Sequence, residues 1–279
     1  MMWARCTLPY CTVRVTKGTP HVRGIWSAAR IWGIFMLAML PAVAQATWHA
    51  GAGHLLLLAV ATVAALGWQA VFARMRRRAP TLSGLMTAMA VVALVPPGTP
   101  WWQVAMAVSF GIVFGEQVFG GPGRNFLNPA VVALAFLMFS FPDPAHHAPV
   151  ALTWLSVVPG ALVLLVLGLV PWRVMAGAVI AAAALAFATG GDPLVHVMAG
   201  GFAFAVVFLA CDPVSSPALP AARWIYGGII GAMTVVGAFA APGVMQTIVF
   251  AVLIGGIFGP LFDQAAIACR LYWRRCRHG

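Results

Sequence analysis

The sequence predicts an all-α, multi-pass membrane protein with about ten transmembrane helices and both termini in the cytoplasm. Three observations predict this fold class: an apolar composition, repeated apolar segments of spanning length, and basic residues confined to one side. Of the 279 residues, 62% are hydrophobic and 8% are charged, whereas about 25% of residues are charged in typical globular proteins. Because so few polar side chains are available to face water, we expect a domain embedded in lipid.

The apolar segments predict where the helices lie. A helix needs about 20 mostly apolar residues to cross the hydrocarbon layer. The chain supplies about ten such segments between turn signals, at 30–46, 53–73, 82–96, 101–119, 129–141, 157–171, 172–190, 193–211, 224–240 and 243–262. Two are short, because they stop at Pro96-Pro97-Gly98 and at Phe141-Pro142. Short segments indicate either broken or tilted helices, such as those that flank transporter sites, or boundaries misplaced by a few residues.

The charge distribution predicts the orientation in the membrane. The chain has 16 Lys and Arg against 5 Asp and Glu, a net charge of +11. On a soluble domain this excess would indicate a nucleic-acid partner, but we expect none here. If the ten segments alternate across the membrane, every Lys and Arg falls in the two tails or in loops on the same side. The positive-inside rule makes that side the cytoplasm.

The same pattern divides the chain into three parts. Residues 1–29 form a basic cytoplasmic tail, residues 30–263 the ten-helix transmembrane domain, and residues 264–279 a second basic cytoplasmic tail. Attraction to anionic lipid explains a basic tail without a special partner. The bilayer is therefore the first partner that the sequence predicts.

Ionisable side chains at membrane depth are costly, so each acid near a span is a functional candidate. Glu116 lies near the end of the fourth span, Asp212 ends the eighth and Asp263 ends the tenth, all on the predicted cytoplasmic side. Carboxylates together with freed backbone carbonyls suit a hard cation, because such cations take oxygen ligands. The alternative is structural: Asp212 caps a turn through its side chain, and Asp263 marks the membrane boundary.

The remaining acids and several histidines carry weaker signals. Asp143 and Asp192 each precede a proline in an outer loop and have the pattern of turn residues. His146 and His147 adjoin Asp143, and an exposed polar loop is the favoured interpretation over a metal site. His196 lies inside the eighth span, either as a proton carrier or as a buried histidine with satisfied hydrogen bonds. The sequence shows no catalytic constellation and no metal-binding motif.

The loop from 120 to 129 is the least generic stretch of the chain. Gly120, Gly121 and Gly123 permit positive φ and close approach of the backbone, and Arg124 supplies a rigid fork for phosphate or carboxylate. Asn128-Pro129 then opens the next helix with a cap and a first-turn proline. The loop reads either as a phosphate cradle or as a tight interhelical turn, and it matches neither a P-loop nor a dinucleotide fingerprint.

Taken together, these stretches resemble the NqrB and RnfD family of membrane subunits. The resemblance covers residues 30 to 265 and is most specific in the Gly-Gly-x-Gly-Arg-Asn loop combined with the Asp-Pro-Val-Ser turn. The matching segments are 94–104, 119–130, 200–204, 212–215, 224–228 and 259–263. The family resemblance implies ten helices in two inverted five-helix halves, and the number agrees with the number of apolar segments.

The resemblance also implies a function. It indicates an integral subunit of an Rnf/Nqr-type electron-transport complex in the bacterial inner membrane. Such a complex moves electrons from NADH to quinone, or between ferredoxin and NAD, while it pumps Na⁺ or H⁺. The expected partners are the other subunits and quinone, and the expected cofactor is FMN or riboflavin. The candidate cofactor-binding residues are Gly120, Gly121, Gly123, Arg124 and Asn125.

Two departures from the family pattern bear on that function. The family attaches FMN to a threonine in a Ser-Gly-Ala-Thr motif between the fifth and sixth helices. The corresponding loop, 142–156, lacks this motif, and Thr153 is its only threonine. The family also places Gly-Lys-Glu before the glycine loop, where this chain has Gly115-Glu116-Gln117. A shift of one residue turns a helical side chain by about 100°, so Glu116 need not reach the family's site.

These departures keep two further functional hypotheses open. One is a flavin-free transporter or channel with the family fold, which the missing Ser-Gly-Ala-Thr motif favours. The other is a structural membrane anchor for redox partners. A cofactor measurement separates the redox subunit from both alternatives.

Overall fold

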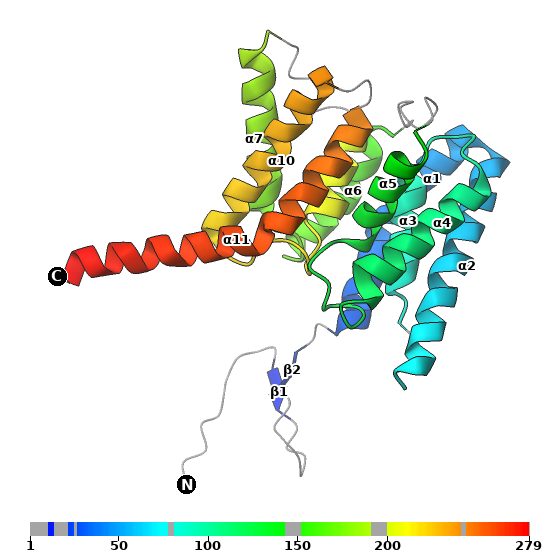
Figure 1. The fold of residues 1–279 in the computed structure, drawn as a ribbon, viewed down its shortest axis with the longest axis horizontal. Helices are drawn as coiled ribbons and strands as arrows, with labels where there is room; N and C mark the ends of the chain where they lie inside the picture. The colour runs from blue at the N-terminus through cyan, green and yellow to red at the C-terminus, as the bar shows by residue number, and fades with distance from the viewer. Residues whose placement is uncertain are drawn as a thin grey trace.

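The computed structural model describes residues 11–13, 22–24, 27–77, 81–142, 152–190, 200–240 and 244–278. Within these ranges ten α-helices form a bundle, and two of them continue as π-helical segments (Figure 1). The α-helices are α1 (Ala28–Ala50), α2 (Ala52–Met75), α3 (Ser83–Leu94), α4 (Trp101–Ile112), α5 (Pro129–Ser140), α6 (Trp154–Val166), α7 (Trp172–Ala188), α9 (Gly200–Phe204), α10 (Pro220–Ala240) and α11 (Val244–His278). The π-helical segments are η1 (Val113–Gln117), which continues α4, and η3 (Ala205–Ala210), which continues α9.

Each of the ten predicted spans overlaps one of these helices, so the described residues contain the predicted number of helices. Among the described residues, four helices are long and apolar enough to cross a membrane: Ala28–Ala50, Ala52–Met75, Pro220–Phe239 and Met245–Trp273. The two segments expected to be short are short, since α3 and α5 have 12 residues each. At 1.5 Å per residue each extends for about 18 Å, less than the hydrocarbon layer of about 30 Å.

The two predicted tails contain regular structure. Strands β1 (Cys11–Val13) and β2 (Val22–Gly24) pair antiparallel, with Cys11 opposite Gly24. This small hairpin is an exception to the all-α prediction, and its β-branched Thr12, Val13 and Val22 favour strands. At the other end, α11 continues through residue 263 to His278 (Figure 1). The division into a membrane domain and two tails stays a prediction.

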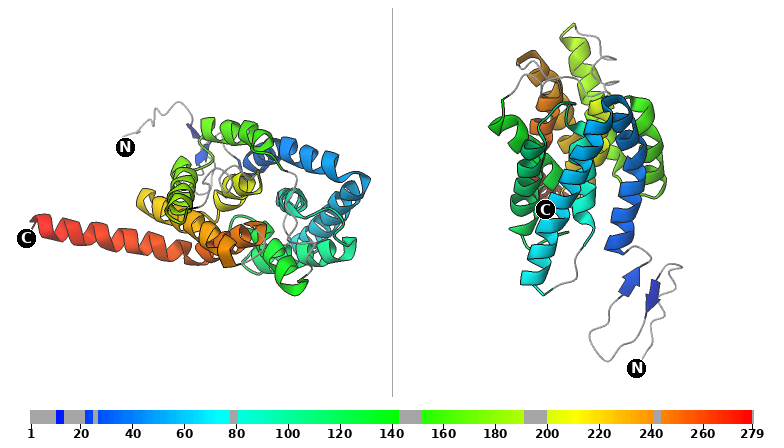
Figure 2. Two further views of the ribbon diagram at one scale, coloured as in Figure 1. Left: turned by 90° about the horizontal axis from the view of Figure 1, so that it is seen from above. Right: turned by 90° about the vertical axis from the view of Figure 1, so that its right-hand side faces the viewer.

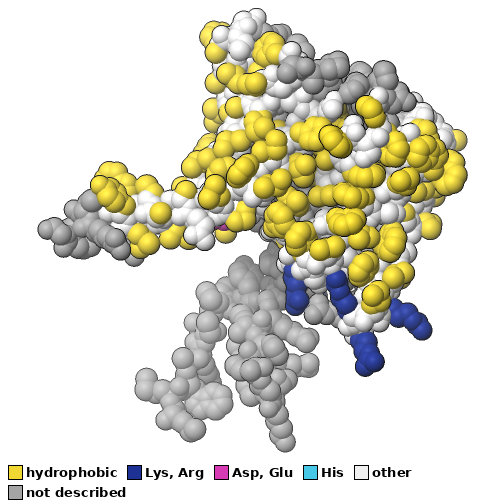
Figure 3. Space-filling model, in the orientation of Figure 1, with side chains coloured by type: hydrophobic (Ala, Val, Ile, Leu, Met, Phe, Trp, Pro, Cys, Tyr) yellow, Lys and Arg dark blue, Asp and Glu magenta, His cyan; other side chains and the backbone are white. Residues whose placement is uncertain are grey.

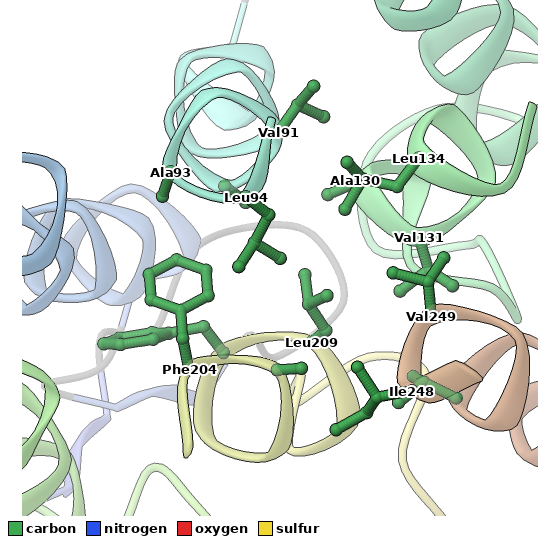
Figure 4. Packing of buried hydrophobic residues seen from close by; sticks show 14 of the residues in the cluster. Val91, Ala93, Leu94, Ala130, Val131, Leu134, Phe204, Leu209, Ile248 and Val249 are labelled. Carbon is green, nitrogen blue, oxygen red and sulfur yellow. The ribbon is translucent and has the colours of Figure 1, made fainter. Parts of the chain in front are cut away.

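Two elements lie inside a ring formed by the other helices. Seen from above, α3 and α9 with η3 are surrounded by the others (Figure 2). All but two residues of α3 and every residue of η3 are buried. Their side chains meet in the core, where Leu94 of α3 faces Phe204 and Leu209 (Figure 4). A helix that is apolar on all sides is expected in such a buried place.

The outer surface is that of a bundle embedded in lipid. Large hydrophobic side chains are exposed along most of the helices, among them Leu37, Val63 and Phe139. Figure 3 shows these apolar side chains over the body of the bundle and several Lys or Arg side chains together at one end. Exposed Arg74 and Arg77 lie at the end of α2 and exposed Arg124 in the loop before α5. This distribution agrees with the one-sided charge pattern of the sequence.

Close helix packing depends on glycine at a few positions. A Cβ on Gly111 of α4 would lie 2.5 Å from the carbonyl oxygen of Pro129 and 2.6 Å from Cβ of Ala133, both in α5. A Cβ on Gly115 would lie 2.9 Å from Cα of Pro129. Small residues let helix backbones approach closely in membranes. The close packing of α4 and η1 against α5 therefore fixes the position of the segment that carries Glu116.

Candidate functional site

Glu116 lies in the π-helical segment η1 that ends α4. The backbone N–H of Val118 donates to the carbonyl oxygen of Val113 at 2.8 Å, five residues earlier. This wider turn accommodates one extra residue, and such turns often occur at functional sites. Glu116 and Gln117 are both buried there, each 3% exposed.

Side chains from two other helices converge on the Glu116 carboxylate. Gln69 of α2 donates through Nε2 to Oε1 at 3.2 Å, and Gln117 donates to the same oxygen at 2.9 Å. The hydroxyl of Ser83, the first residue of α3, donates to Oε2 at 3.3 Å. Gln69 also donates to Ser83 at 2.6 Å. These donors are all neutral, so the hydrogen bonds orient the carboxylate without balancing its charge.

The neighbouring residue, Gln117, has a different partner. Arg76 donates through Nη1 to Oε1 of Gln117 at 3.0 Å and through Nη2 to the Gln117 carbonyl oxygen. The Arg76 guanidinium also lies over the Phe72 ring, with its carbon 5.3 Å from the ring centroid. Gln117 therefore contacts the cation at the end of α2, whereas Glu116 contacts the neutral groups of α2 and α3.

Asp212 follows the second π-helical segment, η3. The N–H of Cys211 donates to the carbonyl oxygen of Val206 at 3.2 Å, which is again a separation of five residues. Oδ2 of Asp212 accepts from the N–H of Ser215 at 3.1 Å and from its hydroxyl at 3.0 Å. Asp212 thus caps the turn, as one of its two sequence interpretations proposed. It is also buried, with 6% of its surface exposed.

Glu116 and Asp212 line the same pocket. Its space is about 30 Å³, close to the volume that one water molecule occupies in the liquid. The other polar side chains that line it are those of Ser83, Thr87, Asn125 and Asn128. The pocket lies where the first turn of inner helix α3 meets the turn that follows inner segment η3. The fold thus brings together two acids that are 96 residues apart in the sequence.

A second pocket adjoins the first. It holds about 130 Å³ and is lined by Gln69, Arg76, Thr81, Gln117 and neighbouring residues, while Trp32 and Pro122 line both pockets. Oε1 of Gln69 is buried without a hydrogen-bond partner among the described residues. A donor or a cation at this position would satisfy that oxygen. The two pockets thus lie side by side, with Arg76 in the lining of one and both acids in the lining of the other.

The glycine loop has the geometry of a tight turn. Gly120, Gly121 and Gly123 have φ of 112°, 97° and 80°, values that favour glycine. The Arg124 side chain is exposed and lies beside Gly120, where a Cβ would be 3.1 Å from its Cδ. Asn125 donates to the carbonyl oxygen of Leu127 at 2.7 Å. These contacts stabilise an interhelical turn, and cofactor binding by the loop stays a prediction.

Asn128 connects this loop to the other half of the site. Its Oδ1 accepts from the N–H of Ala130 at 2.9 Å, which caps α5 as the sequence predicts. Its Nδ2 lies 3.3 Å from the carbonyl oxygen of Leu209 and 3.5 Å from that of Phe208, both in η3. One side chain therefore holds the start of α5 against the end of η3.

Asp263 lies apart from the two paired acids. Its Oδ1 accepts from the N–H of Leu219 at 2.9 Å and its Oδ2 from the N–H of Ala218 at 2.9 Å. These two N–H groups belong to the segment that enters α10. Asp263 therefore attaches α11 to the start of α10, and it does not line the pocket of Glu116 and Asp212.

Comparison with known proteins identifies the family. A model of the NQR2, RnfD, RnfE family matches residues 15–158 and 148–270, most of the chain. The chain belongs to this family. A subunit of the Na⁺-translocating NADH-quinone reductase of Pseudomonas aeruginosa (strain LESB58) is 29% identical over 267 residues, covering 76% of this chain and 66% of the relative. The chain thus spans just under two thirds of that relative.

Longer alignments join the chain to other family members. The corresponding reductase subunits of Yersinia pestis and of Klebsiella pneumoniae (strain 342) are each 28% identical over 383 aligned positions. Each alignment covers 98% of this chain and 93% of the relative. Membership of this family, together with the apolar helices, makes the chain a multi-pass membrane protein.

Thr153 precedes α6, and it is a candidate flavin position only through its place in the loop, which lacks the family motif. Its exposed hydroxyl is paired with Gln45 of α1, which donates through Nε2 at 3.0 Å and accepts through Oε1 at 3.1 Å. A phosphoester at the Thr153 oxygen would disrupt its hydrogen bonds with Gln45, so the described residues do not form a ready attachment site.

Thr153 is also remote from the acids. It contacts Gln45 of α1, whereas Trp32, which also belongs to α1, lines the pocket of Glu116. Thirteen residues of helix separate these two positions, which is about 20 Å along its axis. The proposed flavin position and the acid pocket therefore lie toward opposite ends of α1.

Sequence reasoning missed three residues of the site: Gln69, Ser83 and Arg76. Gln69 is a polar residue well inside a mostly apolar predicted span, a signal that could have marked it. Ser83 and Arg76 are ordinary residues for a helix start and a basic loop, and only the fold brings them to η1. Asp143, His146, His147, Asp192 and His196 lie outside the described residues.

Proposed function

We propose that this chain is a membrane subunit of an ion-translocating electron-transport complex of the Rnf/Nqr type. In this proposal it lies in the bacterial inner membrane with both termini in the cytoplasm, and Na⁺ or H⁺ binds between Glu116 and Asp212 on its way across. The observation that carries the proposal is the burial of these two acids at one small pocket. Family membership and the relatives' role in a Na⁺-translocating NADH-quinone reductase support it.

The chemistry of the pocket favours a cation. Two buried carboxylates whose donors are neutral repel each other, and burial without a counter-charge is costly. A proton shared between them or a hard cation with oxygen ligands removes that cost. Further oxygens come from the Ser83 hydroxyl and the Asn128 side chain, both of which line the pocket. The unpartnered Gln69 Oε1 lies in the adjoining pocket and supplies another acceptor.

The second pocket suggests the route of entry. Arg76 at its edge is hydrogen-bonded to Gln117, and Gln117 in turn donates to Glu116. In the proposed orientation this edge faces the cytoplasm, because the exposed arginines of α2 and of the loop before α5 lie there. A cation that enters from the cytoplasm would pass Gln117 before it reaches the acids. Breaking the contact between Arg76 and Gln117 would then open the route.

The experiment compares transport with electron transfer in the intact complex. The chain is purified with its partner subunits and reconstituted in liposomes, and cation uptake and electron transfer are recorded together. We expect Glu116→Gln and Asp212→Asn each to remove most of the cations moved per electron, because each variant removes one of the two carboxylate ligands of the site. Asp263→Asn is the matched control and should leave that ratio unchanged. Normal transport by both pocket variants would contradict the proposal.

The redox part of the proposal has its own test. The family resemblance supplies FMN or riboflavin as the expected cofactor, with quinone and a soluble electron donor handled by the whole complex. A flavin spectrum of the purified complex, recorded before and after acid precipitation, separates covalent, loosely bound and absent flavin. Thr153→Val should abolish any covalent flavin on this chain if Thr153 is its attachment point.

A flavin-free transporter or channel of the same fold is the second candidate function. The absence of the Ser-Gly-Ala-Thr motif and the pairing of Thr153 with Gln45 favour it. Cation uptake by the isolated chain in liposomes, without any electron donor, would support this function over the redox subunit. A structural anchor would show neither flavin nor uptake.

A further inference from the structure

The segment η1 has an outer face as well as the inner one that carries Glu116. Phe114 and Val118 lie four residues apart, with 53% and 60% of their surfaces exposed. Glu116 and Gln117, which lie between them in the sequence, are both buried. A spacing of four places Phe114 and Val118 on one side of the turn. This outer face of η1 therefore meets lipid, while the inner face meets the acid pocket.

An open groove adjoins the outer face of η1 on the side toward α2. It holds about 440 Å³, and its lining includes Trp68, Met106, Ser109, Phe110, Phe114 and Phe136. The Ser109 hydroxyl already donates to the carbonyl oxygen of Ala105 at 2.7 Å. No charged side chain among the described residues lines the groove. A lining of this kind suits an apolar chain rather than a charged ligand.

A strip of side chains connects this groove to the basic end of α2. The ring centroids of Trp68 and Phe72 lie 6.2 Å apart, and the guanidinium carbon of Arg76 lies 5.3 Å from the Phe72 centroid. The three residues are spaced by four and follow one side of the helix. Eight residues of helix between Trp68 and Arg76 extend for about 12 Å. The groove thus lies about 12 Å deeper in the bundle than the positive charge of Arg76.

The glycine loop brings a further arginine to the same end. A Cβ on Gly121 would lie 3.1 Å from Nη1 of Arg76, and a Cβ on Gly120 would lie 3.1 Å from Cδ of Arg124. The Cα atoms of adjacent residues are about 3.8 Å apart, so one short piece of loop backbone contacts both arginine side chains. Two glycines in succession make this approach possible. The loop therefore joins Arg124 to the arginines of α2.

The positive charge at this end has no acidic counterpart among the described residues. Arg74 and Arg77 are exposed there, and Figure 3 shows several Lys or Arg side chains together. The three described acids are engaged elsewhere, Glu116 and Asp212 at their pocket and Asp263 at the start of α10. Arginine at a membrane surface attracts anionic lipid, and its guanidinium binds phosphate through paired N–H groups.

We propose that an anionic phospholipid binds along the outer face of η1. Its headgroup lies at the arginine cluster of Arg74, Arg76, Arg77 and Arg124, and one acyl chain lies in the groove beside Trp68. Surrounding lipid is as apolar as the groove, so the groove sets the position of the chain without a hydrophobic gain. The preference over a neutral lipid comes from the arginine charges. Binding does not depend on the proposed ion transport.

The first test places the full chain in phosphatidylcholine vesicles that contain a minor fraction of phosphatidylglycerol. Bromine on the acyl chains of one lipid at a time quenches nearby indole fluorescence, and Trp68→Phe identifies the contribution of Trp68. At equal mole fraction, we expect quenching of Trp68 to show about fivefold tighter binding of phosphatidylglycerol, which corresponds to about 1 kcal/mol. The triple variant R74Q/R77Q/R124Q should lose this preference. R270Q/R274Q/R275Q lowers the net charge equally and should keep it.

Equal quenching of Trp68 by the two brominated lipids, or a preference that the triple variant retains, would overturn the proposal. Native mass spectrometry of the full chain in detergent gives a second readout that needs no change at Trp68. With both lipids present in equal amounts, the unsubstituted chain should retain phosphatidylglycerol that the triple variant loses. Millimolar inorganic phosphate should leave this lipid bound. Displacement by phosphate would mean that the arginine cluster binds a soluble anion, and it would overturn the lipid assignment.

Discussion

The two π-helical segments place an acid at the same pocket but hold it in different ways. Glu116 in η1 is held by Gln69 and Ser83, which lie 47 and 33 residues away in the sequence. Asp212 after η3 is held by Ser215, three residues later. The position of Asp212 is thus specified locally, whereas that of Glu116 depends on how α2 and α3 pack.

This difference indicates which half of the site can move. A shift of α2 or α3 would withdraw donors from Glu116 while the turn of Asp212 kept its own hydrogen bonds. Asn128 limits such a shift, because it caps α5 and also reaches the carbonyl oxygens of η3. We infer that Glu116 is the adjustable acid and Asp212 the fixed one, and substitutions can test each side separately.

The largest effect on stability should come from Gly111→Ala in α4. The new Cβ would lie 2.5 Å from a backbone oxygen of α5, so α4 and η1 must move away from α5. We expect the free energy of unfolding in detergent to fall by about 1–3 kcal/mol. Gly67→Ala is the control, because nothing lies within 4 Å of its Cβ position in α2, and it should be neutral or slightly stabilising. Equal effects of the two substitutions would contradict the packing argument.

The next largest effect tests the contact that Asn128 makes between the start of α5 and η3. Asn128→Ser keeps a side-chain oxygen that can cap α5 but loses the amide that donates to the carbonyl oxygens of η3, and we expect a loss of about 1 kcal/mol in unfolding free energy. Asn128→Ala loses both contacts and should cost about 2 kcal/mol. The same unfolding measurement compares the pair. An Asn128→Ser variant as stable as the unsubstituted chain would show that the contact with η3 contributes nothing.

The helices and the acids could be predicted from the sequence, because both signals are local. Runs of apolar residues mark the helices, and the scarcity of acids in such runs marks Glu116 and Asp212. The cap at Asn128 and the glycine turn follow from residue types that allow few other conformations. These features need no knowledge of how the helices pack.

The remaining features of the site depend on tertiary packing. A π-helical turn adds one residue to a helix without a sequence signal, so the directions of Glu116 and Gln117 could not be derived from an α-helical period. Ser83 and Arg76 become partners of η1 only because α2 and α3 end beside it.

A smaller effect should distinguish the serine partners of the two acids. Ser83→Ala removes a donor to Glu116 and the acceptor of Gln69, and we expect a loss of about 1.5 kcal/mol. Ser215→Ala leaves its backbone N–H on Asp212 and should cost about 0.5 kcal/mol. Unfolding free energies and transport should both be more sensitive to Ser83→Ala. The reverse order would mean that Asp212 is the adjustable acid.

The smallest effect is expected at Asp263, the acid outside the pocket of Glu116 and Asp212. Asp263→Asn keeps one oxygen that can accept from the segment entering α10, so its unfolding free energy should change by no more than about 0.5 kcal/mol. Flavin content and assembly with partner subunits should also be unchanged. A large loss of assembly would show that Asp263 has a partner outside this chain.

The central claim is that Glu116 and Asp212 hold one cation together. A double-mutant cycle tests it most directly, with initial rates of cation transport measured for the reconstituted complex carrying Glu116→Gln, Asp212→Asn or both, in sodium and in sodium-free buffer. In the buffer that supports transport, each single substitution should remove most of the rate, and the double variant should be no slower, a coupling above about 1 kcal/mol. Losses that multiply in the double variant would show that the two acids act independently and would contradict a shared site.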